Sequence, residues 1–252
     1  MCGRYAAAKD PAALAEEFGV AVPPEQVLEP DYNVAPTKRV YVVLDREQEG
    51  GPRRELVVAR WGLIPSWAKD PSIGSRLINA RAETVAEKPS FRRAFAKRRC
   101  LVPADGYYEW YVAASTEAKD APAGKPVKQP FFIHPANGSS MAMAGLYEWW
   151  RDPSRDEADP LAWRLTCAIL TTDAAEEVGR IHDRMPMTIP RDDWSAWLDP
   201  ATGLQASELL RPPVGSGLEA YPVSVAVNSV RNNSPDLIVP LAAEDLIPGV
   251  HL

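Results

Sequence analysis

The sequence predicts an α+β fold, in which antiparallel strands make up most of the core and short helices lie around them. Apolar and β-branched runs recur along the 252-residue chain. Several of them lie about ten to fifteen residues apart with turn residues between, which favours antiparallel neighbours over strand–helix–strand units. Runs of strands with helices placed around them are typical of the α+β class.

The predicted strands are the runs richest in aliphatic and aromatic residues. They are RVYVVL (39–44), ELVVARW (55–61), CLVPA (100–104), GYYEWY (106–111), PFFIH (130–134), MAMAGLYEWW (141–150), RLTCAILTT (164–172) and YPVSVAV (221–227). The hexapeptides GYYEWY and GLYEWW are nearly identical, so Glu109 and Glu148 occupy equivalent positions. The pattern alone does not say which of the two acids has a chemical role.

The first predicted helix follows Asp10-Pro11, which supply an N-cap and a proline at the first helical position before AALAEEF. Further helices are predicted over 89–97, 173–180 (capped by Asp173), 191–198 and 206–211. The stretches 112–129 and 152–160 lack periodicity and are predicted to be exposed loops between strands. No composition shift divides the chain, so we expect a single domain over 1–252.

The charge and cysteine content exclude several classes of protein. A net charge of −6 argues against a polyanion partner, yet 76–99 holds eight basic residues and two acidic ones. That run suits either a solvated helix face or a phosphate backbone. Cys100 and Cys167 lie in apolar runs and are expected to be buried; no spacing resembles a zinc site, so no metal or cofactor is predicted.

The N-terminus has neither a signal-peptide core nor any stretch of about 18 uncharged apolar residues. The sequence therefore predicts a cytoplasmic protein, in a reducing compartment, with no membrane partner.

The chain opens MCGRY, which places a cysteine where packing usually offers little. Small residues after the initiator methionine usually permit its removal, so the mature chain is expected to begin at Cys2 with a free α-amine and a thiol on one Cα. About a tenth of an α-amine is neutral at pH 7, against about 0.04% of an unperturbed lysine. A neutral amine forms a Schiff base with an aldehyde, and the neighbouring thiol can close it to a thiazolidine. The alternative use is a thiolate nucleophile whose base is its own α-amine.

Other stretches also carry chemically useful residues. Asn79 and Arg81 are two apart in RLINARAET and share a face if that stretch is extended. Glu109 is flanked by aromatic residues, which can raise a carboxyl pKa and make the group a proton donor. His182 is the only one of the three histidines set among polar residues, although a lone histidine is more often structural than catalytic.

Taken in order, several motifs together resemble one family. They are MCGRY (1–5), YNVAPT (32–37), RWGLIPSW (60–67), NAR-ET (79–84), RRCLVPADGYYEW (98–110), KQPFFI (128–133) and IHDRMP (181–186). This collinear set, which runs from Cys2 to about residue 240, resembles the SRAP family, the SOS-response-associated peptidases or abasic-site processing proteins. The resemblance implies a strongly curved, antiparallel, barrel-like β-sheet with flanking helices.

The resemblance also implies a reaction and roles for individual residues. Members of the family join covalently to abasic sites in single-stranded DNA, so Cys2 would be the crosslinking residue, after autocatalytic loss of the initiator methionine, through a thiazolidine. The implied enzyme combines lyase-like self-crosslinking with autopeptidase (hydrolase) activity. Asn79 would position the backbone and amine of Cys2. Glu109, rather than Glu148, would be the acid–base group, and His182 would help to open the sugar and assist reversal. Glu148 precedes a second tryptophan and the polar stretch 152–160, so it is expected to be exposed.

A second set of residues is implied to contact DNA. They are Arg4, Asn33, Pro36, Trp67, Arg81 and Arg184. The three arginines match positions that look like phosphate clamps, which suits the bidentate guanidinium. The other three would line a cleft where DNA bends and bases unstack. We expect a monomer, associated with the nucleoid when bound to DNA, whose partner is single-stranded DNA containing abasic sites. The sequence does not identify partners at the replication fork.

Ala68 departs from relatives that carry a second aromatic residue after PSW, which predicts weaker base stacking there. Two alternatives stay open. A class II glutamine amidotransferase also begins Met-Cys-Gly, but signatures such as GHTRWAT and NGEIYN are absent, and Arg4 stands where that family has isoleucine. A non-catalytic module that binds single-stranded nucleic acid would suit the basic run 76–99 and the eight tryptophans, but leaves MCGRY unexplained.

Overall fold

The computed structural model describes residues 2–22, 24–112, 128–156, 158–211 and 217–247. The strands are β1 (Tyr5–Ala7), β2 (Asp31–Val34), β3 (Arg39–Gln48), β4 (Gly51–Trp61), β5 (Asn79–Arg81), β6 (Arg99–Ala104), β7 (Gly106–Val112), β8 (Lys128–Pro135), β9 (Met141–Arg151), β10 (Trp163–Asp173), β11 (Arg184–Pro186) and β12 (Leu218–Pro222). The α-helices are α1 (Pro11–Phe18), α2 (Arg92–Lys97), α3 (Glu176–Gly179) and α4 (Trp194–Leu198). The predicted α+β class is confirmed.

Five strands close on themselves into a barrel. The pairings run in the order β10–β4–β3–β6–β9 and return from β9 to β10. Side chains alternate across each strand. One set fills the interior, among them Val42, Val102, Met143 and Cys167. The alternate set packs outward beneath α1, α2 and α4, and includes Val43, Leu101, Ala144 and Ala168.

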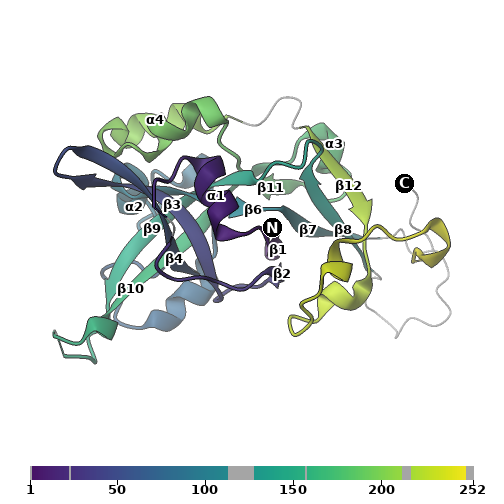
Figure 1. Cartoon of the computed structure of the whole chain (residues 1–252), viewed down its shortest axis with the longest axis horizontal. Helices are drawn as coiled ribbons and strands as arrows, with labels where there is room; N and C mark the ends of the chain where they lie inside the picture. Colours follow the sequence, from purple (N-terminus) through teal and green to yellow (C-terminus); the bar gives the residue numbers. More distant parts are fainter. Residues whose placement is uncertain (1, 23, 113–127, 157, 212–216, 248–252) are drawn as a thin grey trace.

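A second sheet lies beside the barrel and is antiparallel throughout. Its order is β12–β8–β7–β1–β2, and Figure 1 shows β7, β8 and β12 to the right of the barrel strands. Residues of both sheets form one buried cluster, in which Cys2, Tyr5 and Tyr107 pack with Trp61 and Ile169 of the barrel. The chain's N-terminal segment therefore lies at the junction of the two sheets.

Two short strands extend this junction from the barrel side. β5 pairs in parallel with β10, with Asn79 beside Ile169, and β11 pairs antiparallel with β10, with Arg184 beside Asp173. β10 therefore carries both of these strands at one end. β1, β2, β5 and β11 have only three or four residues each, too few for a sequence pattern to predict them as strands.

Most strand pairs are antiparallel, as favoured by the sequence, but β10 pairs in parallel with both β4 and β5. Closing the barrel brings β10 alongside a strand that comes much earlier in the chain, and no local spacing reports such a contact. The run 221–227 is also not one strand. β12 ends at Pro222, and a 3₁₀-helix follows at Val225–Asn228, where the Ser224 hydroxyl accepts from the Ala226 N–H.

The helix predictions hold with shifts at their ends. Asp10 caps α1 by accepting from Ala12 and Ala13, and Gly19 ends it at a φ of 68°. The prediction over 89–97 shrinks to α2, and that over 191–198 becomes a 3₁₀-turn followed by α4.

Two helix predictions need larger corrections. Asp173 is not the cap of α3: it ends β10, and Ala175 precedes that helix. The stretch 206–211 lies mostly in a 3₁₀-helix, Pro200–Leu209. Loops were predicted over 112–129 and 152–160. Residues 113–127 of the first and residue 157 of the second lie outside the described residues.

The two glycines of the repeated hexapeptides allow close packing. A Cβ at Gly145 would lie 2.8 Å from the Cys100 sulfur, and one at Gly106 would lie 2.6 Å from the Ile133 carbonyl oxygen. Cys100 and Cys167 are fully buried, as predicted. In both hexapeptides, the glycine thus lies where a neighbouring strand leaves no room for a Cβ.

Candidate active site

Cys2 is held by the strand that follows it. Tyr5 of β1 pairs with Tyr107 of β7, and the Tyr108 N–H donates to the Arg4 carbonyl oxygen at 2.9 Å. Cys2 is fully buried, and its thiol points to the Arg4 carbonyl at 4.0 Å. Burial, reinforced by the negative charge of Glu109, raises the pKa of the thiol. Both effects favour the neutral thiol over the thiolate.

Asn79 fixes the main chain of Cys2 from the barrel side. Its Nδ2 donates to the Cys2 carbonyl oxygen at 2.7 Å. Pairing of β5 with β10 holds the asparagine in place. The Asn79 Oδ1 atom is buried, and no described residue donates a hydrogen bond to it. This side chain therefore keeps an acceptor available next to Cys2.

Glu109 approaches from the second sheet. Tyr5 pairs with Tyr107, so continuing that antiparallel register by two residues sets Glu109 across from Gly3. The carboxylate is buried, with the residue only 4% exposed. Burial raises the pKa of Glu109, and nearby positive charge, including that of His182, opposes the rise. A carboxyl held this way can both give and take a proton.

His182 completes the group from the loop between α3 and β11. Its Nε2 lies 4.0 Å from Oε2 of Glu109. Its Nδ1 accepts from the Arg184 N–H at 2.9 Å and lies 2.9 Å from Oδ1 of Asp183. Both ring nitrogens thus face defined partners. The four residues predicted to be catalytic therefore come from four separate segments: Asn79, Glu109 and His182 lie together with Cys2.

The structure corrects the expectation for Glu148. It was predicted to be exposed, but it is only 5% exposed and lies in the barrel strand β9. Its Oε2 accepts from Nη2 of Arg98 at 2.7 Å, and its Oε1 accepts from the Trp149 N–H. Burial raises the pKa of Glu148, while Arg98 opposes the rise. Glu148 is thus part of an ion pair of the barrel, whereas Glu109 faces the histidine.

Arg4 and Asn33, both implied to contact DNA, also bind within the protein. Nη1 of Arg4 donates to Oδ1 of Asn33 at 2.7 Å and to the Val227 carbonyl at 2.8 Å, and the guanidinium lies 5.8 Å from the Trp110 ring centroid. Asn33 is fully buried, and its amide donates to the carbonyls of Val227, Ser229 and Asn232. Together they hold the segment 227–232 against β2.

The remaining residues implied to bind DNA differ in accessibility. Arg81 is exposed and has no ion pair within the described part of the chain, and Trp67 is 54% exposed. Pro36 is half-buried. Arg184 is different, because its side chain is only 15% exposed and bonds to Glu83, Asp173 and Thr171.

The basic residues of 76–99 likewise divide into those with partners inside the protein and those exposed on its surface. Arg99 is 2% exposed and donates to carbonyl oxygens of Phe95, Trp197, Asp199 and Gly203, so it is a structural residue of the α2–α4 side. Arg98 pairs with Glu148. Residues such as Arg81, Arg92 and Arg93 are left on the surface.

Sequence reasoning missed the acidic partners at this site. Glu83, Asp173 and Asp183 contact Arg184 or His182. In the sequence, Glu83 and Asp183 look like ordinary polar surface residues, and Asp173 looks like a helix cap. Glu83 and Asp183 do lie inside the motifs NAR-ET and IHDRMP. Their position within those motifs was the one available signal.

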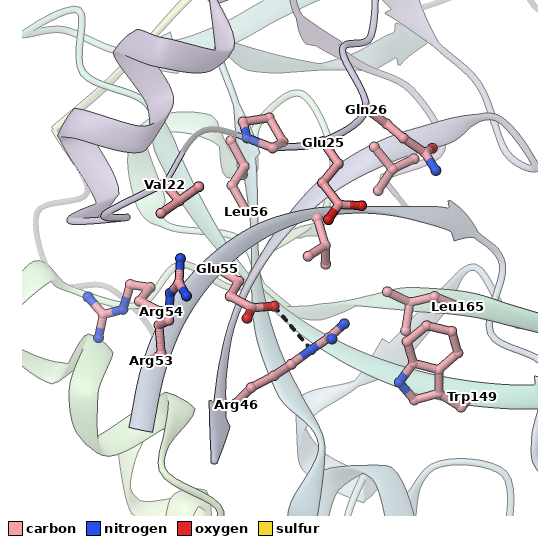
Figure 2. Close-up of a pocket in the computed structure, with 13 residues that line it drawn as sticks. Val22, Glu25, Gln26, Arg46, Arg53, Arg54, Glu55, Leu56, Trp149 and Leu165 are labelled. Carbon is pink, nitrogen blue, oxygen red and sulfur yellow. Dashed lines mark ion pairs between the residues drawn. The ribbon is translucent and has the colours of Figure 1, made fainter. Parts of the chain in front are cut away.

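A groove of about 380 Å³ lies elsewhere on the barrel, along β4 (Figure 2). Arg46 crosses it, pairs with Glu55 at 3.1 Å and lies 5.9 Å from the Trp149 ring centroid. None of the predicted site residues lines this groove. Among the described residues, no group of His, Cys, Asp and Glu could hold a metal ion.

Across the described segments, no helix is both long and apolar enough to span a membrane.

Comparisons with known proteins show which family this chain resembles. The family model described as SOS response associated peptidase (SRAP) matches residues 1–230. The chain is 40% identical over 243 residues to "Abasic site processing protein YoqW" of Bacillus subtilis (strain 168), covering 94% of this chain and 99% of that protein. It is 34% identical over 280 residues to "Abasic site processing protein HMCES" of Gallus gallus, covering 96% of this chain and 78% of that protein.

Solved structures show the same fold. A Bacteroides thetaiotaomicron protein matches with a TM-score of 0.78 at 26% identity, over 96% of this chain and all (100%) of that chain. A phage-related protein of Bordetella bronchiseptica matches with a TM-score of 0.65 at 31% identity, over 88% of this chain and 94% of that chain. With its family signature spread over nearly the whole chain and its N-terminal cysteine set among the signature residues, this protein belongs to the SOS response associated peptidase (SRAP) family.

Proposed function

We propose that this protein processes abasic sites in single-stranded DNA by forming a covalent crosslink through its N-terminal cysteine, which protects the damaged strand. The relatives named above are abasic site processing proteins. The observation that carries the proposal is the setting of Cys2. Its carbonyl accepts a hydrogen bond from Asn79, and the negative charge of Glu109 acts on its thiol. Glu109 in turn faces His182.

The reaction begins with hydrolysis of the Met1–Cys2 peptide bond, which releases methionine and leaves the α-amine on Cys2. The amine then adds to the C1′ aldehyde of the ring-opened abasic sugar, and loss of one water gives an imine. The Cys2 sulfur adds to the imine carbon while the thiol proton passes to nitrogen, which closes a thiazolidine. Relative to mature protein and DNA, the adduct has lost one water.

Burial of the thiol supports this order of steps. Because burial and the charge of Glu109 raise the pKa of the Cys2 thiol, a free thiolate is disfavoured before substrate arrives. An amine that attacks first needs no thiolate. The same setting weighs against an amidohydrolase mechanism, in which the thiolate itself attacks.

The proposed roles of the other residues follow from their contacts. Glu109 would take the proton from the attacking amine and deliver one to the leaving hydroxyl, which suits a buried carboxyl with a raised pKa. His182 would exchange protons with the sugar ring oxygen during opening and reversal. The Oδ1 acceptor of Asn79 would bind the new α-amine while its Nδ2 holds the Cys2 carbonyl.

For DNA, we propose direct contacts from the exposed side chains. Arg81 would meet a phosphate, and Trp67 and Pro36 would contact unstacked bases. Arg4 and Asn33 would shape the floor of the cleft by fixing 227–232. A phosphate would reach Arg184 only by displacing a carboxylate.

A denaturing gel tests the proposal. The purified protein is incubated with a single-stranded oligonucleotide containing one abasic site, beside the undamaged oligonucleotide. The proposal expects an SDS-resistant adduct with abasic DNA alone, since intact DNA presents no aldehyde. An equal yield with both oligonucleotides would reject it.

A further inference from the structure

The two terminal nitrogens of the Arg184 guanidinium bind partners within the protein, whereas its buried Nε has no partner among the described residues. Nη1 donates to Oε1 of Glu83 and to Oδ1 of Asp173, each at 2.7 Å. Nη2 donates to Oε2 of Glu83 at 3.0 Å and to the Thr171 carbonyl at 2.7 Å. The contact with Glu83 is thus a bidentate one, the strongest form of guanidinium–carboxylate pair. Both terminal nitrogens are fully used.

This network joins the two short strands that border the site. Glu83 lies in the turn directly after β5, the strand that carries Asn79. Arg184 begins β11, directly after the loop that carries His182. Both strands pair with β10 at one residue, because Thr171 lies beside Arg81 on one edge and beside Pro186 on the other. The Glu83–Arg184 pair therefore spans β10 and ties the two strands together.

The backbone of Arg184 also contacts the histidine. Its N–H donates to Nδ1 of His182 at 2.9 Å, which requires a lone pair on that nitrogen. In a neutral imidazole the proton is then on Nε2, the nitrogen that faces Glu109 at 4.0 Å. Oδ1 of Asp183 lies 2.9 Å from that same nitrogen and competes with the Arg184 N–H for it, because a carboxylate there would accept from an N–H on Nδ1. The position of the Arg184 N–H therefore bears on which tautomer faces Glu109.

Internal contacts compete with a phosphate at Arg184. A phosphate on either terminal nitrogen would have to break charge-assisted hydrogen bonds to Glu83 or Asp173. Arg81, exposed on the next strand, has no ion pair among the described residues, although its charge acts on Glu83.

We propose that Glu83 and Asp173 are positioning residues for the reaction, and that with Arg184 they form a brace that fixes the orientation and tautomer of His182. The expected effect on the crosslinking rate rests on the proposed function. The orientation and tautomer of the His182 ring do not, because they are properties of the protein without DNA. The charged groups that face the His182 ring include the carboxylates of Glu109 from β7 and of the adjacent Asp183, and Arg184 contacts the ring through its backbone N–H.

The variants for the test are Glu83→Gln and Asp173→Asn, which keep side-chain shape and remove charge from the brace. Glu87→Gln is the matched control, because Glu87 is exposed three residues after the turn and has no ion pair within the described residues. It removes the same charge from the same region. Asp173→Asn leaves the bidentate Glu83 contact intact, so it remains informative if Glu83→Gln folds poorly.

Three measurements are made on each variant. Nitrogen-15 NMR of the imidazoles reports the tautomer of His182, identified among the three histidines by a His182→Gln spectrum. Single-turnover crosslinking across pH reports the chemistry. Binding of undamaged single-stranded DNA across salt concentrations reports phosphate contacts.

We expect the wild-type ring to carry its neutral proton on Nε2 and Glu83→Gln to mix the tautomers. Crosslinking should slow by about tenfold with a shifted pH profile, which is less than the ~10²–10⁴-fold cost of losing a positioned acid–base group. DNA affinity and salt slope should match those of Glu87→Gln. An unchanged His182 spectrum in both brace variants would overturn the proposal, as would a steeper salt slope in Glu83→Gln alone, which would mean that Arg184 contacts phosphate. If wild type forms no crosslink at all, the proposed function fails while the NMR result still decides on the brace.

Discussion

Glu109 and Glu148 occupy the same place in two nearly identical hexapeptides, but they differ in what they face. Glu109 lies 4.0 Å from the ring of His182, and Glu148 forms an ion pair with Arg98 at 2.7 Å. Both are buried, so burial alone does not identify the reactive acid. The neighbouring charged group does: an arginine cannot exchange a proton with its partner near neutral pH, whereas a histidine can.

Glu109→Gln should slow crosslinking at neutral pH by at least about tenfold, because positioned acid–base groups contribute about 10²–10⁴-fold. Binding to undamaged single strands should stay nearly the same, since the amide preserves the shape of the side chain. Single-turnover crosslinking and anisotropy measure the two effects. Glu148→Gln is the matched control, and a larger rate loss in that variant would reverse the assignment.

The same substitution should stabilise the fold in a pH-dependent way. Burial raises the pKa of Glu109 above its ordinary value of 4.5, so the folded state resists ionisation of this group. The stability that the protonated form contributes is complete below 4.5 and is lost as pH rises through the folded pKa. The melting temperature of Glu109→Gln should therefore exceed that of wild type at pH 8 by more than at pH 5. A constant gap would contradict this.

At the scale of elements, the site depends on strands too short to be recognised alone. β1, β5 and β11 have three residues each, and each is ordered by pairing with a longer strand. The helix α1 was predictable because its caps are local: Asp10, Pro11 and Gly19 act within the segment. The α3 cap was not, because Asp173 is bound to Arg184 across a strand pair. The sequence therefore predicts caps that form by hydrogen bonds within one segment, but not contacts between distant segments.

The close approach of β6 to β9 gives a test at this scale. Gly145→Ala should destabilise the protein by about 1–3 kcal/mol, the usual cost of overpacking, since the new Cβ would lie 2.8 Å from the Cys100 sulfur. Chemical denaturation measures the change. Cys100→Ala in the same chain should recover part of the loss.

Gly179→Ala is the control, because no atom lies within 4 Å of its Cβ position. It should be neutral or slightly stabilising. If Gly145→Ala behaves as Gly179→Ala does, the packing argument fails.

At the scale of the whole molecule, the fold supplies the site by joining two sheets. The barrel brings Asn79 and His182 through β10, and the second sheet brings Cys2 and Glu109 through β1 and β7. The residue types and their motifs were visible in the sequence. Their convergence was not derivable from spacing, because Cys2 meets Asn79 across 77 positions of chain. The internal partners of Arg4 and Arg184 were equally invisible, since they come from distant segments.

Exposure separates the arginines that should bind DNA from those that brace the fold. Arg81→Ala should weaken binding to undamaged single strands and reduce the log–log salt slope by about 0.7, the value for one phosphate contact on a single strand. Arg191, which lies over the Trp194 ring on the helix-covered side, provides the control. Equal slopes for Arg81→Ala and Arg191→Ala would remove Arg81 from the interface.

The central claim is that the amine and thiol of Cys2 together form the crosslink, and the intact mass of the adduct tests it most directly. Adducts with abasic single-stranded DNA are isolated without reductant from wild type and from Cys2→Ala, which keeps the α-amine but cannot close a thiazolidine. The account predicts a wild-type adduct equal to the chain without Met1 plus the oligonucleotide less one water, and for Cys2→Ala an adduct only after borohydride trapping. A stable, unreduced adduct from Cys2→Ala, or a wild-type adduct that retains Met1, would contradict it.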